Sequence, residues 1–378
     1  MPPPTPHKPP PRSTCHRPRA PFWNTTASIL PAGAHMPAER VTLQAIATAA
    51  GVSVSTASRV LRGAPGISDA RRRDVLVHAD KLGWAGERAR PCVTVLSSID
   101  TDAADAPDFQ TQLLDGITRT ARDLNVAVRV RLLDPQSGLP PDLLSGTDRT
   151  GRHGILLLSL DQPALTEEIL ACDIPVVIAN GMDLTGRVSS ASAANRSGGY
   201  IACRHLLDLG HRHILRLTHD RRLPVRDRFL GADLALAQAG LTPDRSYEIA
   251  LEDMRSGDAF RAALAALSTH PEITAVQCCN DAAALGVIAA ANALGRQVPQ
   301  DLSVIGFDDI PAAQMSAPAL STIRVPRHEI GAEAVRRLLR VMRAPDSTPV
   351  NAEISGTLQV RGSTTLVRRT PPPAALKT

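Results

Sequence analysis

The spacing of apolar residues divides the chain into zones of different character. Residues 1–38 are rich in proline and lack a periodic apolar pattern, which predicts a tail unable to bury enough surface to fold alone. Residues 39–84 place apolar side chains at helical spacing between short loops, whereas residues 92–365 alternate strand-like apolar runs with amphipathic stretches. The segment 85–91 is predicted to be a short hinge, and 366–378 a frayed proline-rich tail.

The second zone predicts three short helices. The first covers 43–50 and ends at Gly51, which can adopt the left-handed backbone of a sharp turn. Ser53 is a good N-cap for a second helix over 54–61. A loop with glycine and proline follows, and a third helix starts at 68 or 69 and runs to about 82.

The third zone has the rhythm of an α/β fold. Strands alternating with helices at this spacing predict parallel sheets with right-handed crossovers, and the strands are too many for one sheet. We therefore expect two α/β lobes with a ligand-binding cleft beyond the carboxyl ends of the strands. The predicted strands are 93–96, 126–130, 155–158, 175–178, 213–217, 274–277 and 302–305. The predicted helices are 113–124, 198–209, 229–239, 259–267 and 282–294.

The positive charge lies at the front of the chain. Of the net charge of +5, residues 1–38 contribute +4 without any acid, residues 39–90 contribute another +4, and the remainder carries −3. This asymmetry indicates a polyanionic partner for the front and a different task for the rest. The tail can be read as a basic arm that touches DNA, but we favour an idle tail or a true start at Met36.

Several function classes are disfavoured by the sequence. No apolar run is long enough for a membrane helix, and the basic N-terminus lacks the apolar region of a secretory signal. The six cysteines form no CxxC pair or Cys/His ligand spacing, which is typical of reduced thiols in the cytoplasm. We also find no nucleophile elbow, phosphate-binding loop or dinucleotide motif, so we predict no catalytic site, metal or cofactor.

The segment 41–68, VTLQAIATAAGVSVSTASRVLRGAPGIS, is the most specific feature of the chain. In a helix-turn-helix its second helix would lie in the DNA major groove, where the outward residues Val54, Ser55 and Arg59 could reach base edges. Arg59 could bind guanine through two hydrogen bonds, a contact that contributes roughly 1–3 kcal/mol of discrimination. Side chains suited to phosphate oxygens are Thr42, Ser53, Thr56, Ser58 and Arg62.

This segment resembles the headpiece of the LacI/GalR (lactose-repressor) family, whose pattern T-L-x-x-I-A-x-x-A-G-V-S-x-x-T-x-S-R-V-L it matches almost completely. Blocks such as GILLLSL, IPVVIAN, NDAAALGV and VPQDLSVIGFDD resemble the rest of the same family, in order and spacing. The resemblance implies an α/β fold class: a helix-turn-helix headpiece and a two-lobed, periplasmic-binding-protein-like core of parallel sheets. It also implies a cytoplasmic, dimeric repressor that binds double-stranded operator DNA and senses a small-molecule effector.

The resemblance also implies which residues contact the effector. Arg228 matches an arginine that hydrogen-bonds ligand hydroxyls or carboxylates, and the other expected contacts are Asn180, Asn280, Asp308 and, less specifically, Ser97. For Asn280 and Asp308 the alternative is capping of local backbone. Met254 stands where sugar-binding members have an aromatic residue, and Pro224 where a serine contact is expected. A sugar or a similar polar metabolite is the expected effector.

One departure concerns the hinge. Family members insert a hinge-helix leucine into the minor groove, but 85–91 is too short for such a helix and contains no leucine. We expect Arg88 and Arg90 to contact phosphates without a wedge. The tail 366–378 lacks apolar heptads, which favours a homodimer over a tetramer. The alternatives are a solute-binding protein for transport and a sugar-processing enzyme that shares the α/β core.

Overall fold

The structure is a computed structural model, and it describes residues 41–61, 64, 66–82, 91–98, 107–133, 138–139, 143, 153–243 and 247–367. The predicted tail 1–38, Arg62 and most of the predicted hinge, including Arg88 and Arg90, lie outside these residues. The chain divides into two compact units, 1–86 and 87–378, called here the headpiece and the core.

The headpiece contains the three predicted helices, α1 (Leu43–Ala49), α2 (Val54–Leu61) and α3 (Asp69–Lys81). Gly51 has a φ of 60°, as predicted for the corner between α1 and α2. The helices enclose a small hydrophobic core of their own, with Val41, Val52, Leu61 and Ile67 packed around it. Its buried residues are Ile46, Ala47, Ala50, Ala57, Val60, Val75 and Ala79.

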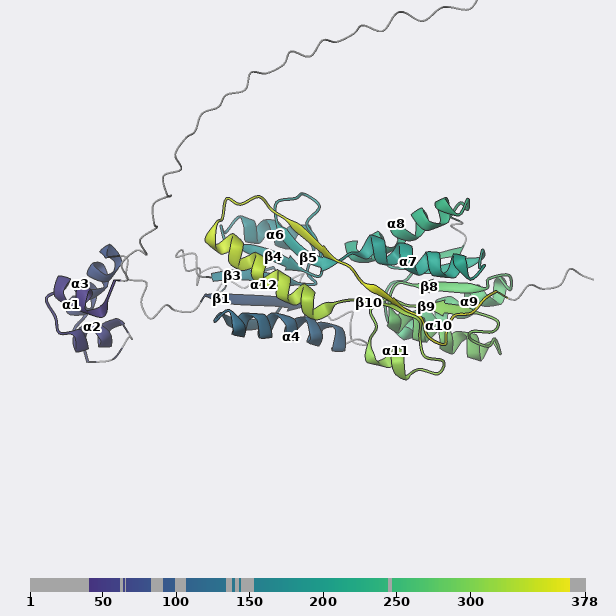
Figure 1. The fold of residues 1–378 in the computed structure, drawn as a ribbon, viewed down its shortest axis with the longest axis horizontal. Coiled ribbons are helices and arrows are strands. Elements are labelled where there is room, and N and C mark those ends of the chain that lie inside the picture. The colour runs from purple at the N-terminus through teal and green to yellow at the C-terminus, as the bar shows by residue number, and fades with distance from the viewer. Residues whose placement is uncertain are drawn as a thin grey trace, which may run out of the picture. The chain divides into compact units, whose positions relative to one another are not determined.

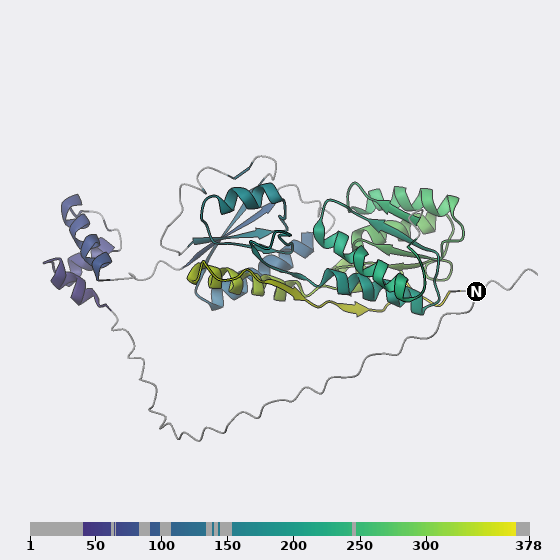
Figure 2. The same ribbon diagram turned by 90° about the horizontal axis from the view of Figure 1, so that it is seen from above.

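The two larger sheets of the core lie in separate lobes, each with helices packed against it (Figures 1 and 2). The first is six-stranded, in the order β11-β5-β4-β3-β1-β2, and the second is four-stranded, in the order β7-β6-β8-β9. All neighbouring strands in both sheets are parallel, which confirms the predicted architecture. The strands of the first sheet are β1 (Cys92–Ser98), β2 (Ala127–Leu133), β3 (His153–Leu158), β4 (Val176–Ala179), β5 (Ser189–Ala193) and β11 (Asn351–Ile354). Those of the second are β6 (Ile214–Thr218), β7 (Glu248–Ala250), β8 (Ala275–Cys278) and β9 (Ser303–Ile305).

Helices cover these sheets and connect their strands. Their bounds are α4 (Pro107–Asp123), α6 (Pro163–Leu170), α7 (Asn195–Asp208), α8 (Leu223–Gln238), α9 (Ser256–Thr269), α10 (Asp281–Ala293), α11 (Pro311–Met315) and α12 (Arg327–Arg343). The chain crosses between the lobes at the ends of β5 and β11 and between β10 (Thr322–Arg324) and α12, where β10 pairs antiparallel with β12 (Thr357–Gln359). Residues from near the C-terminus therefore complete the first lobe, as the yellow segments of Figure 1 show.

Several of these elements were not predicted from the sequence. They are α6, β5, β7, α11, β10, β11, β12 and the long helix α12, although α12 buries residues at helical spacing, from Ile330 to Met342. The short strands hold few residues, and β5 consists of serine and alanine, so neither shows a strong apolar pattern. At the C-terminus, the Val367 amide donates to Leu209 O at 2.9 Å, so the chain still contacts the core beyond residue 366, where the tail was predicted to begin.

Candidate functional sites

The second helix of the headpiece has one buried and one exposed face. Ala57 and Val60 point into the small core, with 0% and 2% of their surface exposed. Val54, Ser55 and Arg59 are exposed. Residues three and four apart share a helix face, so the burial of 57 and 60 is what orients the polar face outward.

Three of the hydroxyl groups predicted to contact phosphate, those of Thr42, Ser53 and Thr56, lie at the starts of helices. The Thr42 hydroxyl accepts a hydrogen bond from the Ala45 amide at 3.2 Å and caps α1. Ser53 Oγ accepts from the Thr56 amide at 3.1 Å and lies 2.8 Å from the Thr56 hydroxyl. Ser58 is partly buried on the same helix. A hydroxyl oxygen has two lone pairs and one proton, so these caps retain further bonding capacity.

In the core, Arg228 is placed by the close packing of α7 and α8. A Cβ atom added at Gly199 would lie 1.8 Å from Arg228 O, and one added at Gly231 would lie 1.9 Å from Arg196 O. Only glycine permits the two backbones to approach this closely. The packing holds the Arg228 side chain at the carboxyl ends of the second-sheet strands, the edge where open α/β sheets bind ligands.

The Arg228 guanidinium is buried and makes several polar contacts. Its Nε donates to Asn195 Oδ1 at 3.0 Å, and its Nη1 donates to Cys279 O. Its Nη2 lies 3.6 Å from Asp308 Oδ1, and the group stacks 3.8 Å above the centre of the Phe307 ring. Burial lowers the pKa of Arg228, and the negative charge of Asp308 opposes this effect.

Asp308 has a strained backbone and a carboxylate with spare bonding capacity. Its φ of 117° lies in a region that non-glycine residues rarely adopt. Burial raises the pKa of Asp308 to about 6, against the opposing effect of Arg228 and Arg327. Among the described residues, Asp308 Oδ1 has no hydrogen-bond partner. A carboxylate beside a buried arginine can hold a polar molecule that offers both donors and acceptors.

Arg327, at the start of α12, holds the Asp308 loop in place. Its Nη1 donates to Asp308 O at 2.8 Å and its Nη2 to Asp309 O at 3.0 Å. Its Nε donates to Gln112 Oε1 at 2.9 Å, so it joins α4 of the first lobe to the loop after β9. Arg327 was not predicted from the sequence. It directly follows the family-like block PALSTIRVP, but that position gives no information about which groups the arginine contacts.

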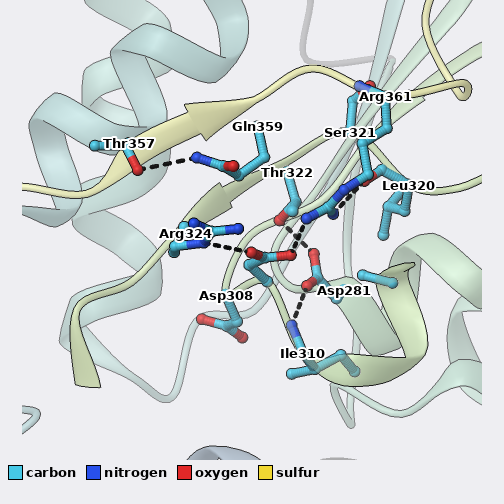
Figure 3. Close-up of polar contacts among 12 residues, drawn as sticks. Asp281, Asp308, Ile310, Leu320, Ser321, Thr322, Arg324, Thr357, Gln359 and Arg361 are labelled. Carbon is cyan, nitrogen blue, oxygen red and sulfur yellow. Dashed lines mark hydrogen bonds and ion pairs between the residues drawn. The ribbon is translucent and has the colours of Figure 1, made fainter. Parts of the chain in front are cut away.

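A second network lies next to Asp308, as Figure 3 shows. The Thr322 hydroxyl donates to Asp281 Oδ1 at 2.5 Å, and the Ile310 amide donates to Asp281 Oδ2 at 2.9 Å. Burial raises the pKa of Asp281 to about 8, and the negative charge of Asp308 adds to the effect. None of the contacts drawn in Figure 3 involves the Asp308 carboxylate, which pairs instead with Arg228.

Asp309 differs from these acids because its carboxylate is fully paired. Arg324 Nε and Arg361 Nη2 both donate to it at 2.6 Å. Burial acts to raise the pKa of Asp309, but these hydrogen bonds outweigh it and hold the pKa below its usual value.

The remaining predicted effector contacts are engaged with other protein groups. Asn280 accepts from the Ala283 amide at 2.8 Å, which caps α10, and donates to Met254 O at 3.2 Å. Asn180, with a φ of 59°, donates to Ser159 Oγ at 2.9 Å. Ser97 donates to Gln110 Oε1 at 3.3 Å. The structure therefore joins Arg228 with Asp308 and Asn280 with Met254, and places Asn180 and Ser97 on the opposite lobe.

One further arginine joins the lobes. Arg222, at the start of α8, lies 3.2 Å through Nε from Asp161 Oδ1 and donates through Nη2 to Asn180 O at 3.0 Å. Neither Arg222 nor Asp161 was singled out from the sequence. Asp161 closely follows β3, as Asn180 follows β4. Its position after a strand was the one sequence feature that could have marked Asp161 as a residue facing the cleft.

A pocket of ≈ 600 Å³ lies where the crossover segments meet α12. It is lined by Gln112, Asp309, Pro311, Gln314, Met315, Arg324, Val325, Pro326, Arg327, His328, Glu329, Ser355 and Thr357. None of the predicted effector contacts lines it, although Asp309 adjoins Asp308 in the chain. In the part of the chain that the structure describes, no helix is both long and apolar enough to cross a membrane.

Known proteins resemble this chain over most of its length. Residues 42–85 match the family described as bacterial regulatory proteins, lacI family, and residues 203–364 match a periplasmic binding protein-like domain. The HTH-type transcriptional regulator MalR of Streptomyces coelicolor (strain ATCC BAA-471 / A3(2) / M145) is 32% identical over 332 residues, which cover 84% of this chain and 95% of MalR.

Solved structures show a similar fold. The transcriptional regulator CelR in complex with cellobiose has a TM-score of 0.67 at 26% identity, covering 86% of this chain and 100% of the CelR chain. The lac repressor dimer bound to operator and the anti-inducer ONPF has a TM-score of 0.64 at 24% identity, with coverage of 86% and 100%. The second likeness is one of fold. Both cover the headpiece as well as the core.

Proposed function

Since the chain belongs to the LacI family of bacterial regulatory proteins, we propose that its headpiece reads an operator and that a small polar effector bound by the core changes the affinity for that operator. The relatives are transcriptional regulators, which leaves a transport protein or an enzyme without support. The observation that carries the proposal is the exposed face of α2, where Ser55 and Arg59 lie opposite the buried Ala57 and Val60.

For DNA recognition we assign two roles. Val54, Ser55 and Arg59 contact base edges in the major groove, and Arg59 pairs with a guanine. The hydroxyls of Thr42, Ser53, Thr56 and Ser58 bind phosphates, together with Arg62, and fix the position of the helix without reading sequence. The position of Thr42, Ser53 and Thr56 at helix starts supports this division, because backbone amides there also favour a phosphate.

We further propose that the protein acts as a homodimer in the bacterial cytoplasm, where the chromosome is accessible. A two-fold dimer presents two copies of α2 to successive major grooves, so the operator should be nearly palindromic. Repression is the simplest outcome, because a bound dimer obstructs the promoter it covers.

For the effector we propose a sugar or a similar polyhydroxylated metabolite. The support is the buried pair of Arg228 and Asp308, which offers donors and an acceptor with spare capacity at the strand ends. Asn180, Met254, Asn280 and Ser97 would complete the site after exchanging their present partners for ligand groups. The cellobiose complex of CelR agrees with this class. The coupling between effector and DNA is expected to be about 1–3 kcal/mol.

The test is selection of genomic fragments by the purified full-length protein. We expect enrichment of a nearly palindromic sequence, and loss of that enrichment in Arg59→Ala. Adding simple sugars to the selected fragment should then change its affinity in the wild type but not in Arg228→Ala. A protein that prefers no duplex over random competitor DNA, with or without sugars, would refute the proposal.

A further inference from the structure

We propose that Arg222 and Asp161 form a latch between the two lobes of the core, which holds the core closed before any effector binds. The inference rests on the proposed function for its regulatory meaning. The latch itself is a property of the core and can be tested without DNA or effector.

The latch joins one helix of the second lobe to two strand ends of the first. Arg222 is the N-cap residue of α8, which follows β6 in the four-stranded sheet. Its Nε lies 3.2 Å from Asp161 Oδ1, after β3, and its Nη2 donates to Asn180 O, after β4, at 3.0 Å. A single planar guanidinium therefore engages two neighbouring strands of the opposite sheet, a geometry that suits arginine.

The latch lies away from the segments where the chain itself crosses between the lobes. The chain itself crosses between the lobes at β5, at β11 and between β10 and α12. Arg327 also joins the lobes, but it lies at one of these crossings, where the chain keeps the lobes together in any case. In the first sheet β3 and β4 lie on one side of the crossing strands β5 and β11, so the Arg222 contacts tie the lobes where no covalent connection does.

The strength of the latch suits a reversible device. Asp161 and Arg222 have only 4% and 19% of their side chains exposed, so their attraction is weakly screened by solvent. Opening the lobes returns both charges to water, however, which offsets much of that attraction. Among the described residues, Asp161 Oδ2 and Arg222 Nε lack a hydrogen bond, so the pair is not fully satisfied even when closed. A contact of this kind can be strengthened or released by a ligand that binds one of the two states more tightly.

Gly181 allows Asp161 to take its position. A Cβ atom added at Gly181 would lie 2.9 Å from Ile178 Cγ2 and 3.0 Å from Asp161 Cβ. The side chain of any other residue would push against the start of the Asp161 side chain. Gly181→Ala therefore offers a way to disturb the latch without removing either charge.

The experiment compares hydrogen exchange and small-angle scattering of the effector-free, full-length wild type with those of Arg222→Ala. Loss of a charge-assisted contact should favour opening by about tenfold, seen as about tenfold faster exchange in peptides covering 159–163 and 178–182, with a larger radius of gyration. Arg221→Ala, which removes an exposed neighbouring arginine, should match the wild type. Unchanged exchange and radius in Arg222→Ala would overturn the latch.

Two further variants establish the mechanism. Arg222→Ala combined with Asp161→Ala should open no further than Arg222→Ala alone, and Gly181→Ala should reproduce part of the same change. An additive double variant would show that the two residues act independently and would refute the pair. A uniform rise in exchange across both sheets would mean unfolding instead of opening, and would also count against the latch. None of these readouts depends on operator binding, so they stand apart from a failure of the proposed function.

Discussion

The headpiece and the core carry their candidate functional side chains in opposite surroundings. On α2, Ser55 and Arg59 are exposed on a unit whose small core only shapes the helix that presents them. In the core, Arg228 and Asp308 are buried with 7% and 8% of their surface exposed, and each depends on the other's charge. An exposed group is available to any partner, whereas a buried pair is costly to disturb and selective in what it accepts.

The difference also explains why the site in the headpiece is easier to predict from sequence than the site in the core. The face of α2 is defined by residues within one helical turn of each other. Arg228, in contrast, meets partners 33 and 51 residues away in the chain, at Asn195 and Cys279. Local spacing therefore carries information about the headpiece that it cannot carry about the core.

The largest effect is expected from removing one partner of the buried pair, at Arg228. Arg228→Met should leave the Asp308 carboxylate buried without its partner, which is expected to cost about 3–5 kcal/mol of core stability. Denaturant unfolding followed by circular dichroism measures the loss. Arg226→Met on the same helix is exposed and should change stability little. If both variants lose the same small free energy of unfolding, burial does not determine how much the pair of Arg228 and Asp308 contributes to stability.

In the headpiece the sensitive position is apolar. Ile46 is fully buried, so Ile46→Ala should destabilise this unit by about 2–5 kcal/mol, enough to abolish DNA binding while the core remains folded. Leu76→Ala, at a position 46% exposed, is the matched control. Calorimetry should show the core transition unchanged. Loss of both transitions together would mean that the two units do not fold independently.

A smaller effect, on affinity alone, is expected at Arg59. Arg59→Ala should lower the preference for the selected operator over random duplex by about 1–3 kcal/mol, because a bidentate contact to guanine is lost. Competition binding at fixed salt measures this preference. Arg71→Ala, on the exposed surface of α3, should lower affinity for both duplexes alike. An unchanged preference in Arg59→Ala would remove this residue from the base contacts.

Much of the fold and part of the candidate site were predictable from sequence for physical reasons. The parallel sheets follow from apolar runs that alternate with amphipathic helices, and Arg228 and Asp308 were found in segments that resemble known motifs. Arg222, Asp161 and Arg327 were missed because their roles come from contacts across the lobes. The alternative of capping for Asn280 now has a concrete contact, at Ala283, while its predicted role toward an effector stays a prediction.

The smallest expected effect is a dependence of core stability on pH. Burial raises the pKa of Asp281 to about 8 and that of Asp308 to about 6, from a usual value of 3.8. The folded core therefore retains protons that the unfolded chain releases, so stability falls as the pH rises from about 4 to 8 and stays low above. Between pH 6.5 and 8 the fall should be about 1–2 kcal/mol, mainly from Asp281.

Asp281→Asn sharpens this prediction. Its amide can accept from the Ile310 amide and donate to the Thr322 hydroxyl, which then accepts where it donates to Asp281 in the wild type. The variant should therefore lose the pH dependence without losing the contacts. Burial lowers the pKa of His205 and His211, which weakens the core mainly below pH 6.5 and opposes the Asp281 effect at the lower end of the window. Both histidines are kept in Asp281→Asn, so the difference between the two curves isolates Asp281. If the curves of unfolding free energy against pH were parallel for wild type and variant, a group other than Asp281 would be responsible for the pH dependence.

The placement of α12 and β11 in the first lobe has a consequence for biosynthesis. The sheet that begins with β1 is completed by residues 327–354, which are synthesised long after β1. The headpiece, in contrast, precedes the core in the chain and can fold before the core is complete. A chain cut short near its end would therefore carry an intact headpiece on a core that lacks part of its scaffold, and quality control by proteases would decide whether such fragments compete for the operator.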